Sequence, residues 1–351
     1  MSQVDRCAHL PIAITMGDPA GIGPEIIAKA FVEQPQAMRG CFVVGDVGCM
    51  RRANRLFSSL GRPLLPVIEW SAPPALDGLP PGAMSVLQVG ATLAPMAFGQ
   101  VSALAGAAAG HSVLRAAADA LAGRVGAVVT APLHKEALHA AGAPFDTFPG
   151  HTEMLQDTAA RHLGTAVPVR MMLANEELRT VLVSIHISLR QAIEAVTFEN
   201  VLQTIQISHR ALTALLGRAP RIAVAGLNPH AGEGGLFGSE EQEIIIPAIA
   251  QARALGCDVQ GPYPPDTIFM RARKPAGAAA EFDVVVAMYH DQGLIPVKYL
   301  GVEQGVNVTL GLPFVRTSPD HGTAFDIAGT GRASAASLLA AVAMARKLIT
   351  S

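Results

Sequence analysis

The chain has 351 residues, of which 50% are hydrophobic and 15% charged, and its 26 basic and 28 acidic residues give a formal net charge of -2. This length allows two lobes that each bury a core, and the lack of a basic excess argues against a nucleic-acid partner. The apolar stretch 333–345 is shorter than the roughly 20 residues of a membrane span, so no membrane partner is expected.

Short runs of β-branched residues alternate along the chain with longer stretches rich in Ala and Leu. Strands are predicted at 11–15, 41–44, 126–130, 167–173, 180–185, 221–226 and 283–288. Apolar residues at helical spacing predict helices at 24–33, 111–123, 198–217 and 240–256. This alternation predicts an α/β fold with a mostly parallel sheet and flanking helices. Two stretches, 72–85 and 273–282, have the composition of surface connections.

The cysteines and the N-terminus point to a reducing compartment. Cys7, Cys41, Cys49 and Cys257 have no spacing typical of a metal site or a disulfide scaffold, so we expect free thiols. The first ten residues include an acidic side chain and lack an apolar core, which is not typical of a secretory signal. A cytoplasmic protein is therefore expected.

Polar side chains follow five of the predicted strands at the point where each strand ends. In open α/β sheets, ligands bind beyond the carboxyl ends of the strands. The sequence therefore predicts a site at this edge of the sheet. The side chains concerned are Asp18, His134, Lys135, His186, Asn228, His230, His290 and Asp291.

Of the four histidines in this set, three are considered as metal ligands, because His186, His230 and His290 each come from a separate strand end. Three neutral imidazoles and one open position are typical of a catalytic metal site, and they suit zinc, cobalt or nickel. Asp291 could orient an imidazole or bind substrate. The alternative is that these histidines are hydrogen-bonded structural residues. That role is the expected one for His9, His111, His139, His162 and His209.

Two glycine-rich loops lie beside these strand ends. The loop 16–26 joins a strand to a helix, but it is neither the dinucleotide fingerprint G-x-G-x-x-G nor a Walker A loop. The loop 230–241 would let backbone approach a ligand beside His230, although a plain turn is equally consistent. Its last residues, with Glu241 to Glu243, suit the start of a helix.

A third loop, 316–331, begins with Arg316 and precedes the Ala-rich stretch 333–345, which is expected to form the final helix. Lys298 and Asn307 lie a short distance upstream. A guanidinium, an ammonium and an amide together would suit a phosphate or carboxylate group. Alternatively, Lys298 and Arg316 are solvated surface charges, as such residues usually are.

Five motifs, taken in order, resemble the 4-hydroxythreonine-4-phosphate dehydrogenase family of vitamin B6 synthesis. The similarity runs from about residue 11 to the C-terminus. The family is similar in fold to isocitrate and isopropylmalate dehydrogenases. That resemblance implies one lobe from 1–125 with 305–351, and a second from 126–304 with the metal site and dimer contacts. The motifs are TMGDPAGIGPE, FPGHTEML, GLNPHAGEGG, AMYHDQGLIPVKYLG and GVNVTLGLPFVRTSPDHGTAFDIAG.

The resemblance also implies roles for particular residues. A divalent metal (zinc, cobalt or magnesium) would be held by the three histidines where two subunits meet, which implies a homodimer. By analogy with isopropylmalate dehydrogenase, the loop 320–331 would contact the adenosine end of NAD through His321, Gly322 and Asp326. The substrate contacts implied are His151, Thr152, Lys298, Asn307 and Arg316.

The activity that follows from the resemblance is NAD-dependent oxidation and decarboxylation of a phosphorylated 3-hydroxy acid. The metal would activate the substrate hydroxyl, and Lys298 would help to anchor the phosphate. Asp266 and Asp291 are candidates for proton transfer, with Lys298 as a further catalytic candidate. The expected substrate is 4-hydroxythreonine 4-phosphate.

Two departures from the usual motifs, GDPAG at 17–21 and GLIPVKYLG at 293–301, resemble a sister group that oxidises D-threonate or D-erythronate 4-phosphate. A further relative oxidises a cis-dihydrodiol of terephthalate. A rival from another class is a non-catalytic, metal-dependent binding protein. A metal-free Rossmann reductase is disfavoured because no G-x-G-x-x-G follows a predicted strand.

Overall fold

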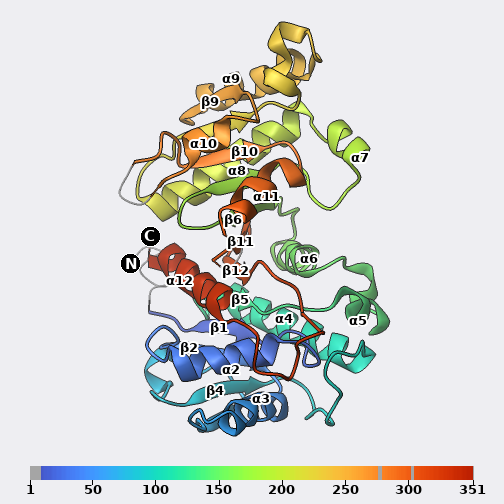
Figure 1. The fold of residues 1–351 in the computed structure, drawn as a ribbon, viewed down its shortest axis with the longest axis vertical. Helices are drawn as coiled ribbons and strands as arrows, with labels where there is room; N and C mark the ends of the chain where they lie inside the picture. The colour runs from blue at the N-terminus through green and yellow to red at the C-terminus, as the bar shows by residue number, and fades with distance from the viewer. Residues whose placement is uncertain (1–8, 276–278, 302–303, 351) are drawn as a thin grey trace. The chain divides into compact units, whose positions relative to one another are not determined.

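The computed structural model describes residues 9–275, 279–301 and 304–350 (Figure 1). The chain divides into two compact units, Met1–Pro168 with Leu312–Thr350 and Val169–Gly311. The first unit contains residues 126–168, which the sequence prediction had assigned to the second lobe. The reason is that the strand at Ala127–Thr130 pairs with two strands of the first unit.

The first unit contains a parallel sheet with the strand order β3-β4-β2-β1-β5-β12. Its strands are β1 (Ile12–Thr15), β2 (Cys41–Gly45), β3 (Val67–Trp70), β4 (Met84–Gln88), β5 (Ala127–Thr130) and β12 (Val315–Pro319). Its helices are α2 (Gly23–Glu33), α3 (Val47–Ser59), α4 (Ala103–Leu121), α5 (Lys135–Ala140), α6 (His151–Leu163) and α12 (Ala336–Thr350), with the short turns η1 (Leu76–Gly78) and η2 (Phe145–Thr147).

Helices cover both faces of this sheet. Ala13 and Val128 pack with Ala116 of α4 on one face. On the other face, Thr317 donates a hydrogen bond from Oγ1 to the carbonyl of Ala341 in α12. The strands β1, β2 and β5 are buried along their whole length because both of their faces are covered. The GDPAG turn follows the carboxyl end of β1, and the segment before α5 follows the carboxyl end of β5.

The second unit contains the strand order β11-β6-β7-β10-β8-β9. β6 is antiparallel to β7 and β11, and the pairs among β7, β10, β8 and β9 are parallel. The strands are β6 (Arg170–Ala174), β7 (Arg179–Leu182), β8 (Ile222–Ala225), β9 (Val259–Tyr263), β10 (Val284–Ala287) and β11 (Val306–Leu310). The helices are α7 (Leu189–Glu194), α8 (Phe198–Leu216), α9 (Ile246–Ala254), α10 (Ile268–Ala272) and α11 (His290–Tyr299), with the turns η3 (Pro229–Gly235) and η4 (Glu241–Ile245).

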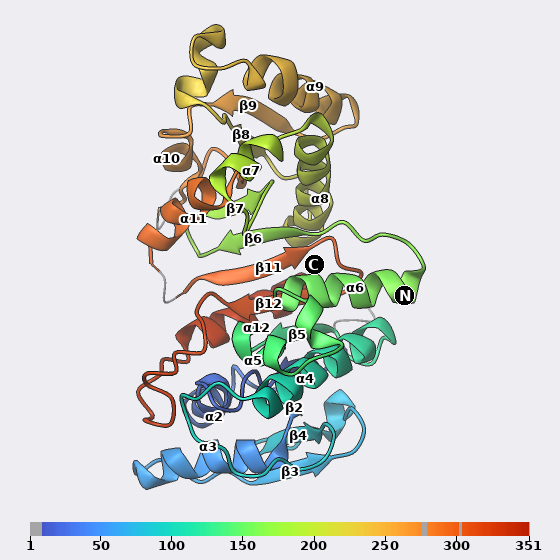
Figure 2. The same ribbon diagram turned by 90° about the vertical axis from the view of Figure 1, so that its right-hand side faces the viewer.

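The second sheet is also covered on both faces. Figure 2 shows α8 and α9 on one side and α10 and α11 on the other. Phe269 of α10 and Leu294 of α11 pack with Val285 in one buried cluster. The predicted α/β fold with a mostly parallel sheet and flanking helices is therefore confirmed.

The sequence prediction missed five strands, β3, β4, β9, β11 and β12. β12 contains Arg316, Thr317 and Ser318, all of which are buried. Polar residues of this kind are not typical of a buried strand, so the local pattern indicated a loop. The expected connection 72–85 contains η1 and reaches the first residues of β4, whereas part of the second, 276–278, lies outside the described residues.

Two further predictions concern cysteines and membranes. Cys41, Cys49 and Cys257 are buried free thiols, as expected, and Cys7 lies outside the described residues. Within the described part of the chain, no helix has both the length and the apolar character that a bilayer crossing requires.

Candidate functional site

The GDPAG turn at the end of β1 buries a carboxylate. Asp18 is fully buried, and its Oδ1 accepts a hydrogen bond of 2.8 Å from the Ala20 amide. Burial raises the pKa of Asp18, while the Ala20 amide and the nearby His134 act in the opposite direction. Gly17 has φ +73°, and a Cβ there would lie 2.5 Å from the Pro132 carbonyl oxygen, so this turn requires glycine. The turn therefore holds Asp18 against the end of β5.

A second cluster of candidate site residues in the first unit includes Arg316 of β12 and His151 of α6. Arg316 is 3% exposed and donates hydrogen bonds from Nε and Nη2 to Thr130 Oγ1, at 3.2 and 2.7 Å. Burial lowers the pKa of Arg316 to about 10, with Glu153 opposing the shift. Arg316 is therefore not the solvated surface charge of the alternative interpretation. A buried guanidinium on a rigid strand is suited to binding an anion.

His151, the first residue of α6, belongs to the same group. Its Nε2 atom is buried without a hydrogen-bond partner among the described residues, although the residue as a whole is half-buried. Burial first, and then the charge of Arg316, holds the pKa of His151 well below 6.5. The imidazole is therefore neutral at neutral pH. A buried polar atom of this kind is typical of a ligand contact. Thr152 follows in the same helical turn and is half-buried.

Side chains of α2 bind the backbone at the end of the loop that contains His321, Gly322 and Asp326. Glu25 accepts hydrogen bonds from the amides of Gly329 and Ala333, at 2.9 and 3.3 Å. One turn later, Lys29 donates to the Ala333 carbonyl at 2.8 Å. Gly322 and Asp326 are exposed, so these two positions of the loop stay accessible.

The same loop reaches the end of β5 through an aromatic contact. The rings of His134 and Phe325 are stacked, with centroids 4.5 Å apart and an angle of 17° between their planes. His321 lies earlier in the loop, with Nδ1 3.1 Å from the Gly322 carbonyl oxygen. Its Nε2 is buried and has no hydrogen-bond partner among the described residues. The loop therefore places Nε2 of His321, which has no hydrogen-bond partner among the described residues, next to the small residue Gly322.

In the second unit, two of the three predicted metal ligands are neighbours. The ring centroids of His186 and His290 lie 5.6 Å apart. The Nδ1 of His290 lies 2.6 Å from Oδ1 of Asp291. A carboxylate on Nδ1 favours the tautomer that leaves Nε2 as an electron-pair donor. This pair of imidazoles, with its carboxylate, is therefore chemically suited to a divalent ion.

The third predicted ligand, His230, lies on an unusual turn. In η3, His230, Ala231 and Glu233 have positive φ values of 53°, 55° and 43°. His186 also has a positive φ, 47°. Non-glycine residues rarely adopt this conformation, which is found mostly at functional sites. The His230 side chain is 63% exposed, with Nδ1 3.8 Å from Oε2 of Glu233.

His230 does not complete a metal site with the other two histidines. Across the described ranges 9–275, 279–301 and 304–350, no group of three or more His, Cys, Asp and Glu side chains is arranged to hold a metal ion. The structure therefore brings together His186, His290 and Asp291 but not the complete predicted triad.

The remaining predicted residues of the second unit are placed individually. Asn307 lies in β11, and its Oδ1 is buried with no hydrogen-bond partner in the described part of the chain. Lys298 lies in the last turn of α11 and is half-buried. Asp266 is exposed in the connection between β9 and α10. Of the two carboxylates considered for proton transfer, only Asp291 is seen to contact a predicted metal ligand.

Sequence reasoning missed residues that support the histidine loops. Glu241 was expected to favour a helix start through its charge, but its buried carboxylate accepts hydrogen bonds from the Leu227 and Asn228 amides. Gln292 bonds to the backbone of two different loops. Gln292 could have been noticed because it directly follows His290 and Asp291 in the sequence. Its side-chain amide, however, does not by itself predict which groups it binds.

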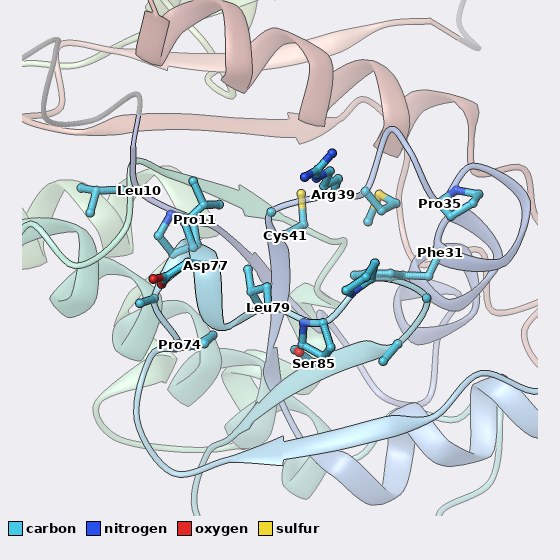
Figure 3. Close-up of a pocket in the computed structure, with 18 of the residues that line it drawn as sticks. Leu10, Pro11, Phe31, Pro35, Arg39, Cys41, Pro74, Asp77, Leu79 and Ser85 are labelled. Atoms are coloured by element: carbon cyan, nitrogen blue, oxygen red, sulfur yellow. The ribbon is translucent and has the colours of Figure 1, made fainter.

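A cavity of about 1410 Å³ lies elsewhere in the first unit (Figure 3). It is lined by residues at the amino ends of three strands, including Pro11, Cys41 and Ser85. Its lining includes none of the predicted site residues. Because ligands of α/β sheets bind at the carboxyl ends, the strand-end residues described above remain the better candidate.

Comparison with known proteins identifies the family. The family model of the pyridoxal phosphate biosynthetic protein PdxA matches residues 37–345. The chain belongs to this family. The resemblance recognised in the sequence motifs is therefore confirmed.

Individual members of the PdxA family match over nearly the whole chain. A 4-hydroxythreonine-4-phosphate dehydrogenase of Beijerinckia indica is 52% identical over 338 residues, which cover 96% of this chain and 95% of the relative. A D-threonate 4-phosphate dehydrogenase of Cupriavidus necator is 46% identical over 346 residues, with coverage of 97% and 98%. The crystal structure of a 4-hydroxythreonine-4-phosphate dehydrogenase from Klebsiella pneumoniae has a TM-score of 0.82 at 42% identity, covering 97% of this chain and 99% of that chain.

Proposed function

We propose that this protein is an NAD-dependent, metal-dependent dehydrogenase that oxidises and decarboxylates 4-hydroxythreonine 4-phosphate. The observation that carries this proposal is the pairing of His186 with His290, whose Nδ1 contacts Asp291. Such a donor set has no evident structural purpose at an exposed strand end. The 52% identity to a dehydrogenase named for this substrate favours it over the other candidates.

The proposed metal ligands are His186, His230 and His290. Imidazole donors, with a carboxylate orienting one of them, fit zinc or cobalt better than magnesium, which prefers oxygen ligands. When bound, the ion would lower the pKa of the substrate hydroxyl and stabilise negative charge on its oxygen. In one chain only His186 and His290 of these three are neighbours. We therefore propose that in a homodimer the third ligand, His230, comes from the second copy.

Exposed apolar side chains support a dimer at this part of the second unit. Directly after His186, Ile187, Leu189 and Ile193 are 46%, 60% and 45% exposed. Leu236, six positions after His230, is 72% exposed. Large apolar side chains beside a functional group are typical of a protein–protein interface.

The substrate phosphate is proposed to bind Arg316 and His151, with Thr152, Lys298 and Asn307 as further substrate contacts. The buried guanidinium of Arg316 keeps its charge at neutral pH, because a pKa of about 10 is still well above 7. The neutral His151 can donate a hydrogen bond to a phosphate oxygen. Binding energy from the phosphate would orient the hydroxyl carbon for reaction.

NAD is the proposed acceptor of the hydride, with its adenosine end on His321, Gly322 and Asp326. The substrate alcohol loses a hydride from carbon and a proton from oxygen, which gives a ketone. The carboxylate on the carbon next to that ketone then leaves as carbon dioxide, the electron pair of the broken bond forms an enolate, and the carbon that held the carboxylate takes up a proton. Asp291 and Asp266 are the carboxylates proposed for these proton transfers, with Lys298 as a third candidate.

A second candidate function is oxidation of D-threonate or D-erythronate 4-phosphate. The 46% identity to a D-threonate 4-phosphate dehydrogenase and the GDPAG motif around Asp18 favour it. The terephthalate cis-dihydrodiol would replace the phosphate with a second carboxylate on Arg316. A non-catalytic binding protein is the alternative from another class.

These candidates can be separated by one parallel assay. Purified protein is incubated with NAD, zinc or cobalt, and each of the four substrates in turn, while NADH formation and carbon dioxide release are recorded. We expect the highest kcat/KM for 4-hydroxythreonine 4-phosphate and no activity in His290→Ala. The assignment fails if a different substrate gives the highest kcat/KM. Substrate binding without NAD reduction under every condition would favour the binding protein.

A further inference from the structure

The side-chain amide of Gln292 connects two of the loops that carry the proposed metal ligands. Its Oε1 accepts a hydrogen bond of 2.7 Å from the Met288 amide, two positions before His290. Its Nε2 donates a hydrogen bond of 2.8 Å to the Gly226 carbonyl, four positions before His230. One end of this side chain must accept and the other must donate, which a glutamine can do and a glutamate cannot at neutral pH.

The third histidine loop is connected to the same point. Ser184, two positions before His186, donates a hydrogen bond of 3.0 Å from Oγ to the Met288 carbonyl. The Val183 amide donates to the Ala287 carbonyl at 2.9 Å. Ala287 is the last residue of β10 and Met288 follows it, so the backbone before His186 is fixed relative to the backbone before His290.

The Gly226 side of the connection is also held in place. Glu241 accepts hydrogen bonds from the Leu227 and Asn228 amides through one oxygen, at 2.7 and 2.8 Å. Its other oxygen accepts from Asn228 Nδ2 at 2.9 Å. A Cβ on Gly226 would lie 2.8 Å from Cα of Ala231, so the turn closes tightly around this position. Glu241 thus fixes the shape of the His230 turn, and Gln292 fixes its position.

We propose that Gln292 is a positioning residue that holds the His290 loop against the His230 loop of the same chain, so that in the proposed homodimer the two loops deliver their histidines to the two metal sites at the correct spacing. The proposal rests on the metal site of the proposed function. Its physical basis is that the side chains of His230 and His290 are 63% and 39% exposed, so packing around these two side chains does not by itself fix their spacing. Their spacing must then come from the backbone, and hydrogen-bonded partners behind metal ligands are what usually provide it.

Two substitutions test this role. Gln292→Met keeps the length of the side chain but removes both hydrogen bonds. Gln292→Glu keeps the acceptor for the Met288 amide, replaces the donor by an oxygen and adds a negative charge. If Gln292 acted only through electrostatics, added negative charge would strengthen cation binding, whereas a positioning role predicts weaker binding in both variants. Gln251 is exposed on α9, so Gln251→Met and Gln251→Glu are matched controls.

Zinc affinity of metal-free protein is measured by titration calorimetry, and the exchange of backbone amides in 226–230 by mass spectrometry. We expect both Gln292 variants to bind zinc about tenfold or more weakly. We also expect faster amide exchange over 226–230, while the Gln251 variants match the wild type. Thermal unfolding of the metal-free proteins tests whether each variant remains folded, and only variants with the wild-type midpoint are compared. If neither Gln292 variant passes, Gln292→Asn is measured in their place.

The result separates this inference from the proposed function. Wild-type zinc affinity in folded Gln292 variants overturns the positioning role. If His290→Ala leaves zinc binding unchanged, the proposed metal site itself fails, and the exchange measurement then decides alone whether Gln292 orders the 226–230 turn. Unchanged exchange in that case also overturns the inference.

Discussion

The Nδ1 atom of His290 and the Oδ1 atom of Asp291, the next residue in the chain, lie 2.6 Å apart. The Asp291 side chain makes this contact although it is 72% exposed. A carboxylate on Nδ1 favours the tautomer in which Nε2 of His290 offers its electron pair to a metal, and this ring neighbours that of His186. The interaction therefore has a direct consequence for metal binding.

Asp291→Asn should weaken metal binding. An amide at this position removes the charge that supports the imidazole, and loss of such a partner typically lowers metal affinity about 10- to 100-fold. Zinc titration of metal-free protein measures the change. Asp258→Asn, at an exposed position of the same unit, serves as control and should behave as the wild type. Equal affinities in both variants would mean that Asp291 has no part in orienting His290.

Glu25→Gln should weaken NAD binding more than it slows the reaction. Its carboxylate accepts the Gly329 and Ala333 amides, and a glutamine retains only one of the two acceptor oxygens. A lost hydrogen bond to a charged group is worth about 1.5–3 kcal/mol, so we expect KM for NAD to rise about tenfold with kcat less affected. Steady-state kinetics measure both constants. The exposed Glu33→Gln, on the same helix, should change neither. A fall in kcat alone would contradict this role of Glu25.

Leu189→Glu should dissociate the proposed homodimer. Leu189 is 60% exposed on α7, close to His186 in the chain, and a buried charge at an interface is strongly unfavourable. Light scattering after size-exclusion chromatography should report a monomer with weakened zinc binding. Leu255, which is 54% exposed, lies just after α9 and shortly before β9 begins, at the amino end of that strand. Leu255→Glu should therefore remain a dimer. A dimeric Leu189→Glu would place the interface elsewhere.

Asp283→Asn should lower the free energy of unfolding by about 2 kcal/mol at neutral pH, the scale of hydrogen bonds to a charged group. Asp283 accepts hydrogen bonds from Arg218 and Arg221 at the start of β10. Burial alone would raise the pKa of Asp283, but these hydrogen bonds outweigh it and hold the pKa well below 3.8. Chemical denaturation at neutral pH measures the loss. Asp157→Asn, which removes a surface pair with Arg161, should cost under about 1 kcal/mol.

Asp283 also makes the free energy of unfolding depend on pH in the acid range. Because the folded pKa of Asp283 is lowered, the unfolded chain takes up a proton first as the pH falls. The stabilisation is therefore complete above pH 3.8 and is lost as the pH falls from there towards the folded pKa. The stability of Asp283→Asn should depend less on pH in that window. A wild-type pH dependence in the variant would contradict this account.

Much of the fold could be predicted because its signals are local. The buried strands β1, β5 and β10 consist of apolar, mostly β-branched residues, and such runs are visible without knowledge of their neighbours. β12 could not be predicted in this way. Arg316 and Thr317 are buried there by α12, which follows in the chain, and by β5, which comes from a distant part of the chain. Tertiary contacts decided that these polar residues form a buried strand.

The candidate site divides in the same way. The sequence by itself determined which chemical groups stand near strand ends, because each histidine follows its own strand within a few residues, as His186 follows β7 and His290 follows β10. Only the tertiary structure decided that these two rings are neighbours and that Gln292 joins the His290 loop to Gly226. The physical reason is that strand formation depends on the pattern of adjacent residues, whereas the pairing of β7, β10 and β8 depends on how separate segments pack.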